Sequence, residues 1–219
     1  MEKVETALKI DPSKFHIVGN NLSLDFLNTV IAANGKPLDL LENWADLAAW
    51  TIAARLLEPA QAEKFLESWS GKKESEAEFN LAIEFREVLR EMILAIKKGT
   101  KVKPKIIKAI NEMLNHKNGT VEIEQTADGF EKRFHAAFNN PRQLLAPVAE
   151  SATDLLCYAN PALIKKCEAR ECVLYFYDAT KNHSRRWCSM AACGNRAKAA
   201  SFYRRQKLKS ASEQNRSNK

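Results

Sequence analysis

Four cysteines near the carboxyl end constrain the fold of this 219-residue chain more than any other feature of its sequence. Cys167 and Cys172 are separated by four residues, fifteen residues follow, and Cys188 and Cys193 are again separated by four. Tetrahedral Zn²⁺ accepts four thiolate ligands, and two close pairs joined by a loop supply them at low entropic cost. The spacing therefore predicts one zinc ion held by these cysteines. An iron–sulfur cluster, which uses the same ligand type, stays open as an alternative.

A site with four thiolates has no open coordination position for water, so we expect a structural zinc and not a catalytic one. The metal would replace the hydrophobic core that a module of about 45 residues cannot build alone. The zinc and its thiolates carry a charge of about −2, which nearby cations such as Arg185 and Arg186 are expected to offset. The fifth cysteine, Cys157, falls in a predicted helix and is expected to be a buried apolar side chain.

Residues 1–5 contain no apolar segment, and no apolar run in the chain is long enough to cross a bilayer. A hydrophobic content of 45% and a charged content of 28% are typical of soluble globular proteins. We therefore expect a cytoplasmic protein with no membrane partner. In that compartment, paired cysteines serve as metal ligands more often than as disulfides.

The net charge of +7 is concentrated at one end of the chain. Residues 161–219 contain 14 Lys and Arg against 4 Asp and Glu, whereas residues 1–160 contain 20 against 23. Such an asymmetry indicates contact with nucleic acid, although a merely solubilising tail would produce the same pattern.

We predict a domain boundary at Asn160–Pro161, where the composition becomes basic and rich in cysteine. Residues 1–160 are predicted to form a mainly helical domain with one small β-hairpin, and residues 161–209 a treble-clef-like zinc finger, giving an α+β fold. Residues 210–219 are polar and predicted to be disordered. Apolar side chains recur at helical intervals over 40–57, 59–71, 74–98, from 104 and from 141, and the hairpin is predicted over 120–135.

The expected finger begins with a knuckle at the first cysteine pair, continues with a small hairpin over 173–184, and ends with a helix from the second pair to about Lys209. The helix carries cations on two adjacent sides, which suits phosphate contacts or entry into a major groove. A solvated helix bound to nothing is the alternative. Trp187 and Phe202 are expected to support the finger as apolar side chains. The residues assigned to nucleic-acid binding are Arg185, Arg186, Arg196, Lys198, Arg204, Arg205 and Lys207.

The residues around the second cysteine pair resemble the CGNR-type zinc finger, a family named for the Cys-Gly-Asn-Arg run that stands here at Cys193–Arg196. Residues Phe176–Thr180 are similar to that family's Phe-x-Asp-x-Ser pattern, with threonine in place of serine. Gly19–Thr29 resembles the opening of the ABATE domain that accompanies this finger. The resemblance implies a bacterial, stress-linked transcription regulator with the finger as its DNA-binding part.

The first 160 residues show no nucleophile–base pair, no phosphate-binding loop and no His/carboxylate metal spacing, so we expect no enzymatic activity. Asp25 and Asn28 lie one helical turn apart, and cap or turn roles explain them better than a pocket does. The leading hypothesis is a DNA-binding regulator, located on the nucleoid, whose N-terminal domain senses a small-molecule effector or forms a homodimer. The alternative is a zinc-stabilised RNA- or protein-binding module without a transcriptional role.

Overall fold

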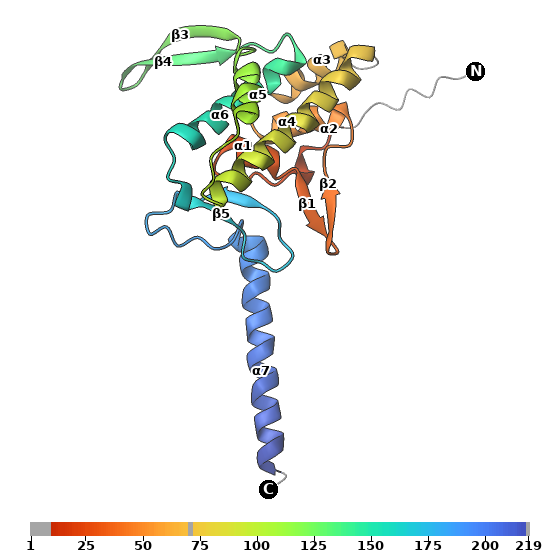
Figure 1. Cartoon of the computed structure of the whole chain (residues 1–219), viewed down its shortest axis with the longest axis vertical. Coiled ribbons are helices and arrows are strands. Elements are labelled where there is room, and N and C mark those ends of the chain that lie inside the picture. Colours follow the sequence, from red (N-terminus) through yellow and green to blue (C-terminus); the bar gives the residue numbers. More distant parts are fainter. Residues whose placement is uncertain (1–9, 70–71, 218–219) are drawn as a thin grey trace, which may run out of the picture.

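The computed structural model describes residues 10–69 and 72–217, in which helices dominate and three two-stranded hairpins interrupt them (Figure 1). This arrangement confirms the predicted α+β fold with a predominantly helical N-terminal part. The helices are α1 (Leu22–Leu27), α2 (Trp44–Ala53), α3 (Pro59–Trp69), α4 (Lys73–Lys97), α5 (Pro104–Leu114), α6 (Ala146–Cys157) and α7 (Asn195–Ser217). The strands are β1 (Val30–Ala33), β2 (Lys36–Asp39), β3 (Gly119–Thr126), β4 (Gly129–Ala136), β5 (Ile164–Lys166) and β6 (Tyr175–Tyr177).

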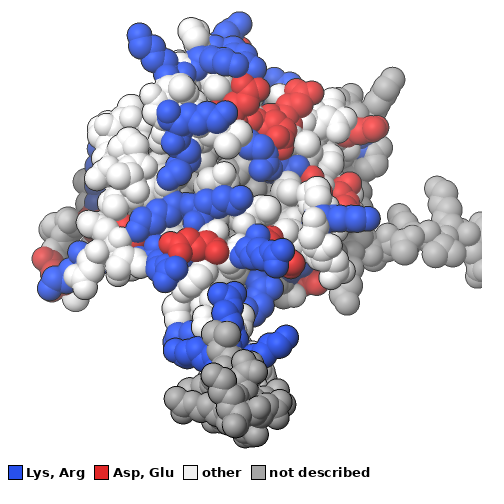
Figure 2. Space-filling view, turned by 60° about the horizontal axis from the view of Figure 1, so that its bottom comes forward, with Lys and Arg blue, Asp and Glu red and all other residues white. Residues whose placement is uncertain are grey.

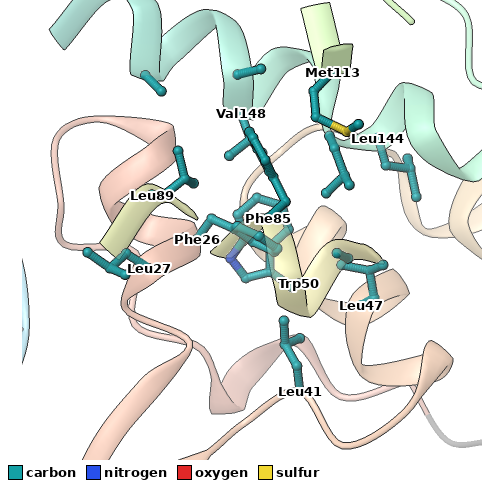
Figure 3. Packing of buried hydrophobic residues seen from close by; sticks show 14 of the residues in the cluster. Phe26, Leu27, Leu41, Leu47, Trp50, Phe85, Leu89, Met113, Leu144 and Val148 are labelled. Atoms are coloured by element: carbon teal, nitrogen blue, oxygen red, sulfur yellow. The ribbon is translucent and has the colours of Figure 1, made fainter. Parts of the chain in front are cut away.

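The core lies where α4 packs against the shorter helices α1, α2 and α5, and α6 packs against α1 and α5. Apolar side chains of α4 recur every three or four residues and are buried, because this spacing places them on one face of a helix. Phe26 of α1 meets Trp50 of α2 edge to face, with ring centroids 4.8 Å apart, and Leu89 of α4 belongs to the same cluster (Figure 3). Ile164 of β5 also belongs to this cluster, and Tyr175 and Tyr177 of β6 pack against it, so the C-terminal part contacts the same core.

Helix α2 begins at Trp44, four residues after the predicted start at residue 40. Asn43 is its N-cap, and its side chain accepts from the Asp46 backbone N–H at 3.2 Å, while the Asp46 carboxylate accepts from the Asn43 N–H in return. Asp39 has capping-box spacing in the sequence, but its carboxylate binds the buried guanidinium of Arg86, with one N–O distance of 2.7 Å. Asp39 therefore forms a long-range ion pair and does not cap the helix.

Hairpin β1–β2 was not among the expected elements. Its turn is Asn34-Gly35, and both residues have positive φ, 51° and 76°. This pair is the typical sequence of a two-residue hairpin turn, because Asn and Gly tolerate the left-handed region best. The Asn-Gly pair that predicts this hairpin turn was therefore present in the sequence.

The predicted hairpin over 120–135 is confirmed as β3–β4, with Gly119 opposite Ala136 and Thr126 opposite Gly129. It extends away from the helices at one end of the molecule (Figure 1). Cys157, at the end of α6, is exposed, so the expectation that it is buried was wrong. No helix in the described ranges is long and apolar enough to span a membrane.

Helix α7 stands away from the rest of the molecule and runs to Ser217, beyond the predicted end at residue 209 (Figure 1). The residues expected to form a disordered tail, 210–219, are helical as far as Ser217, and residues 218–219 lie outside the described ranges. No glycine or proline occurs between Asn195 and Ser217, so the sequence contains no strong helix stop there.

Leu89→Ala should lower the free energy of unfolding by about 2–5 kcal/mol, because it removes a fully buried side chain and leaves a cavity. Leu94→Ala on the same helix is the matched control, since Leu94 is 41% exposed, and its effect should stay below about 1 kcal/mol. Urea unfolding followed by circular dichroism measures both values. Equal losses of stability in the two variants would contradict the proposed core.

Candidate metal centre and nucleic-acid interface

The four cysteines named in the sequence analysis come together at one point. Cys167 follows β5, Cys172 ends the next turn, Cys188 lies in an irregular segment, and Cys193 lies in a π-helical turn, Met190–Gly194, that leads into α7. Their sulfur atoms all lie within 4.8 Å of one another. The Cys172–Cys188 distance between sulfurs is 3.8 Å, and the Cys188–Cys193 distance is 3.5 Å.

These sulfur positions fit zinc. Four Zn–S bonds of about 2.3 Å at tetrahedral angles place neighbouring sulfurs about 3.8 Å apart, close to both distances above. Three of the four cysteines are buried, and Cys172 is half-buried. A zinc ion bound here would crosslink the segment covalently and would have no position left for substrate or water.

Donors around the sulfurs suit a negatively charged metal group. The Cys188 backbone N–H donates to the sulfur of Cys167 at 3.3 Å, and the guanidinium of Arg196 donates to the sulfur of Cys193 at 3.1 Å. The hydrogen bond to Cys193 raises the pKa of Arg196. A hydrogen bond from the Cys188 thiol lowers the pKa of Cys172, whereas burial raises the pKa of Cys167.

The residues Cys193–Arg196 make contacts within the finger. A Cβ atom on Gly194 would lie 2.6 Å from the sulfur of Met190, so this position requires close packing. The side chain of Asn195 donates to the carbonyl four residues back at 3.2 Å. With Arg196 bound to the Cys193 sulfur, all four residues stabilise the turn that carries the metal ligand into α7.

The hairpin of the finger is not where we predicted it. The prediction of a hairpin over 173–184 is wrong, because β6 pairs with the upstream strand β5. In this pairing Ile164 lies opposite Tyr177 and Lys166 lies opposite Tyr175. The first cysteine pair consequently lies in the connection between the two strands. The treble-clef assignment stays a prediction.

Asp178 explains why the chain after β6 turns back without forming a strand pair. Its carboxylate is fully buried and accepts from the Lys165 ammonium at 2.7 Å, the Arg185 backbone N–H at 2.9 Å and the Thr180 hydroxyl at 2.6 Å. Burial raises the pKa of Asp178, but these hydrogen bonds outweigh it and hold the pKa well below its usual range. Threonine at position 180 supplies the hydroxyl that the family's serine would supply.

Arg185 joins the finger to the N-terminal part. Its guanidinium donates to the carbonyl of Cys188 at 2.5 Å and to the carbonyl of Val18 at 2.7 Å, and it lies 4.1 Å from the ring centroid of Phe176. These contacts occupy the side chain. The structure therefore places this predicted nucleic-acid residue, half-buried, between the finger and the N-terminal part.

The open edge of β6 is covered by the N-terminal segment that resembles the start of the ABATE domain. The Asn28 amide donates to the Tyr175 carbonyl at 2.8 Å and accepts from the Tyr175 N–H at 2.9 Å, as a neighbouring strand would. The Tyr177 N–H donates to the Gly19 carbonyl at 2.7 Å, and the Asn20 amide donates to the Tyr177 carbonyl at 3.2 Å. Sequence reasoning gave Asn28 a local cap or turn role and missed this long-range contact.

Asp25 fixes the turn that makes these contacts. Its carboxylate accepts from the backbone N–H groups of Val18 at 2.8 Å and Gly19 at 2.6 Å. A Cβ atom on Gly19 would lie 2.9 Å from that carboxylate, so only glycine fits. Burial raises the pKa of Asp25 to about 6, although the two hydrogen bonds and the charge of Arg185 act against it.

The remaining predicted nucleic-acid residues divide into two groups. Arg186 is exposed but forms an ion pair with Glu168 at 2.6 Å, and Arg196 binds the metal-site sulfur. Lys198, Arg204, Arg205 and Lys207 are exposed on α7 and form no ion pair with any residue that the structure describes. Phe202, expected to support the finger, is 52% exposed and contacts Tyr203, whereas Trp187 does pack against the finger's buried cluster.

Comparison with known families gives two matches. A family model described as "ABATE: Putative stress-induced transcription regulator" matches residues 20–159. A second model, described as "CGNR zinc finger", matches residues 164–206. A comparison with curated proteins finds no match.

Cys188→Ser should release the zinc, so that the metal content falls from about one ion per chain to nearly none, because three thiolates no longer close the site. Cys157→Ser is the matched control and should retain the metal, since Cys157 is an exposed cysteine on α6. Elemental analysis of the purified proteins measures this. Stoichiometric zinc in Cys188→Ser would show that the ligand set is wrong.

The helical signal of α1–α6 should persist in the Cys188→Ser variant, since their core contains no metal ligand.

The free energy of unfolding should depend on pH through Asp25. Its folded pKa of about 6 lies above its ordinary value of 3.8, so folding takes up a proton between these values. The contribution of Asp25 is therefore favourable at low pH and disappears as the pH rises to about 6. Relative to Asp25→Asn, the wild type should become less stable by about 2 kcal/mol between pH 4 and pH 6. Urea unfolding of both proteins, with zinc present, tests this, and a difference that does not change with pH would contradict it.

Proposed function

The chain belongs to the ABATE family and carries a CGNR zinc finger, and from this premise we propose that it is a DNA-binding transcription regulator whose contact element is α7. The observation that carries the proposal is a basic helix, held at its first turn by the metal site and otherwise free of the protein (Figure 1). On this proposal the protein acts at the nucleoid, and the zinc is structural.

The charges of α7 support a nucleic-acid partner. Lys198 and Arg205 are seven residues apart and lie on one side of the helix, and Arg204 and Lys207 lie on adjacent turns. Cations without protein partners keep their charge available for phosphates, and each phosphate neutralised releases a counterion. Figure 2 shows many Lys and Arg on the face of the molecule around this helix, with acidic residues interspersed among them.

The dimensions of α7 suit a duplex. Its 23 residues give a length of about 34 Å at 1.5 Å per residue, close to one turn of B-DNA. A major groove about 12 Å wide admits one α-helix. Because α7 projects beyond the finger, a duplex can approach it without meeting the N-terminal domain (Figure 1).

A hollow of about 910 Å³ lies beside the first turns of α7, between this helix, the turn of the first cysteine pair and strand β1. Arg170, Arg196 and Arg204 line it together with the carboxylates of Glu168 and Glu171. The arginines outnumber the carboxylates by one, and Arg196 is held by the Cys193 sulfur, so Arg204 on α7 is the lining cation that the proposal uses.

One observation favours a second function. Phe202 and Tyr203 are 52% and 72% exposed on α7, and exposed aromatic rings beside cations are typical of proteins that stack the bases of single-stranded RNA. A zinc-stabilised RNA-binding module is therefore the alternative to the DNA-binding regulator.

Arg204→Ala/Arg205→Ala should weaken duplex DNA binding and lower the salt dependence of the binding constant. The slope of log K against log salt should fall by about 2, because each removed guanidinium leaves one phosphate with its counterion. Lys64→Ala/Lys108→Ala is the control with the same charge change, on α3 and α5 away from α7, and should leave the slope unchanged (Figure 1). Fluorescence anisotropy at several salt concentrations measures it. An unchanged slope in the α7 variant would contradict the proposal, and retention of single-stranded RNA alone would favour the RNA-binding module.

A further inference from the structure

Hairpin β3–β4 has one apolar face. Side chains of paired residues point to the same side of an antiparallel hairpin, and alternate pairs point to opposite sides. The pairs on one face are Val121 with Phe134, Ile123 with Lys132, and Gln125 with Phe130. Four large apolar side chains therefore lie together on this face.

That face is open to solvent. Val121, Ile123, Phe130 and Phe134 are 56%, 76%, 78% and 44% exposed. Single exposed apolar residues are ordinary on a protein surface, but a contiguous patch indicates an interaction site. With about 150–200 Å² for each fully exposed side chain of this size, the patch presents roughly 400–500 Å² of apolar surface.

The hairpin is joined to the helices at its base. The Lys117 ammonium lies 4.6 Å from the ring centroid of Phe134 and 2.6 Å from a carboxylate oxygen of Glu150 on α6. Beyond this base the two strands extend away from the helices (Figure 1). An isolated two-stranded hairpin is marginally stable in water, so this one needs a second layer against its apolar face.

The opposite face of the hairpin is polar and its charges are mostly paired. Arg133 binds Glu124 at 3.1 Å and Glu131 at 2.9 Å, and His135 lies 3.0 Å from Glu124. Residues 119–136 hold four carboxylates against one lysine and one arginine, a net charge of −2. This charge opposes a polyanionic partner such as nucleic acid or an anionic lipid surface. The apolar face therefore fits a protein surface.

We propose that two copies of this chain dimerise by packing the apolar faces of their β3–β4 hairpins against each other across a two-fold axis. The contact would bury roughly 800–1,000 Å² in total, at the low end for specific interfaces, which gives a weak, concentration-dependent dimer. Lys132 lies on the contacting face, and its long side chain can extend to the rim of the contact so that the ammonium stays in water.

The proposed dimer leaves the nucleic-acid contact free. The hairpin lies at the end of the molecule opposite α7 (Figure 1), so both basic helices stay exposed when the hairpins pack. The dimer contact does not depend on the proposed function, because it uses no residue of the finger.

Sedimentation velocity of the zinc-loaded full chain over roughly 1–500 µM tests the dimer. The wild type should shift from monomer to dimer as its concentration rises. Ile123→Glu/Phe130→Glu should raise the dimer dissociation constant at least about 100-fold, and Phe130→Ser at least about tenfold. Thr120→Glu/Thr126→Glu adds the same charge to the opposite face and should leave the constant within about threefold.

A wild type that stays monomeric over the whole range would overturn the proposal. A dimer dissociation constant that is unchanged in the apolar-face variants would overturn it as well. So would a monomeric wild type that binds phosphatidylcholine vesicles, as detected by co-sedimentation. Both Ile123 and Phe130 are largely exposed, so their substitution should leave the monomer folded, as circular dichroism would show. The salt slope of DNA binding per copy should be unchanged in these variants, which separates failure of the dimer from failure of the DNA contact.

Discussion

The convergence of four sulfur atoms is the constraint on which the C-terminal part of this protein depends. Apart from three of the cysteines themselves, Leu174 and Phe176 are the buried residues of the finger's cluster within the described ranges. So little apolar burial does not offset the entropy of ordering about 45 residues. Bonds from the four thiolates to a zinc ion would supply what burial does not, and the turn that carries Cys193 also starts α7. The start of the basic helix therefore lies at the candidate metal site.

A second constraint sets the finger against the N-terminal domain. Asn28 occupies both backbone groups of Tyr175, Gly19 accepts from Tyr177, and Arg185 donates into the turn that Asp25 holds. Backbone groups on an open strand edge need partners, and α1 together with the turn before it supplies them. The finger is consequently docked on the helical domain, and the N-terminal residues that resemble the opening of the ABATE domain are the ones that dock it.

The parts that the sequence predicts well are governed by local spacing. The 3.6-residue period locates α4 to within a residue at each end, alternation locates β3–β4, and cysteine spacing locates the metal ligands that the structure brings together. The failures come from contacts between distant residues. Asp39 has the spacing of a helix cap, and nothing in its neighbourhood reveals Arg86. The sequence predicts downstream pairing for β6 because Ile164–Lys166 carries no strand signal.

The same distinction applies to the basic residues. Composition and helical period assign seven cations to nucleic acid, but they describe charge and not its partners. The structure commits Arg185 to backbone carbonyls, Arg186 to Glu168 and Arg196 to a sulfur, and these contacts join residues that only the fold brings together. The four cations left on α7 are those that a local helical period describes correctly.

Hydrogen exchange over the whole chain, with and without saturating duplex DNA, tests most directly whether α7 is the contact element. In the free protein the backbone amides of this projecting helix should exchange much faster than those of α4, whose apolar face is buried. Binding through α7 predicts that DNA slows exchange in residues 195–207 and leaves α4 and β3–β4 unchanged. Slower exchange confined to the N-terminal domain, or no change in α7 at saturation, would contradict a finger that presents this helix to DNA.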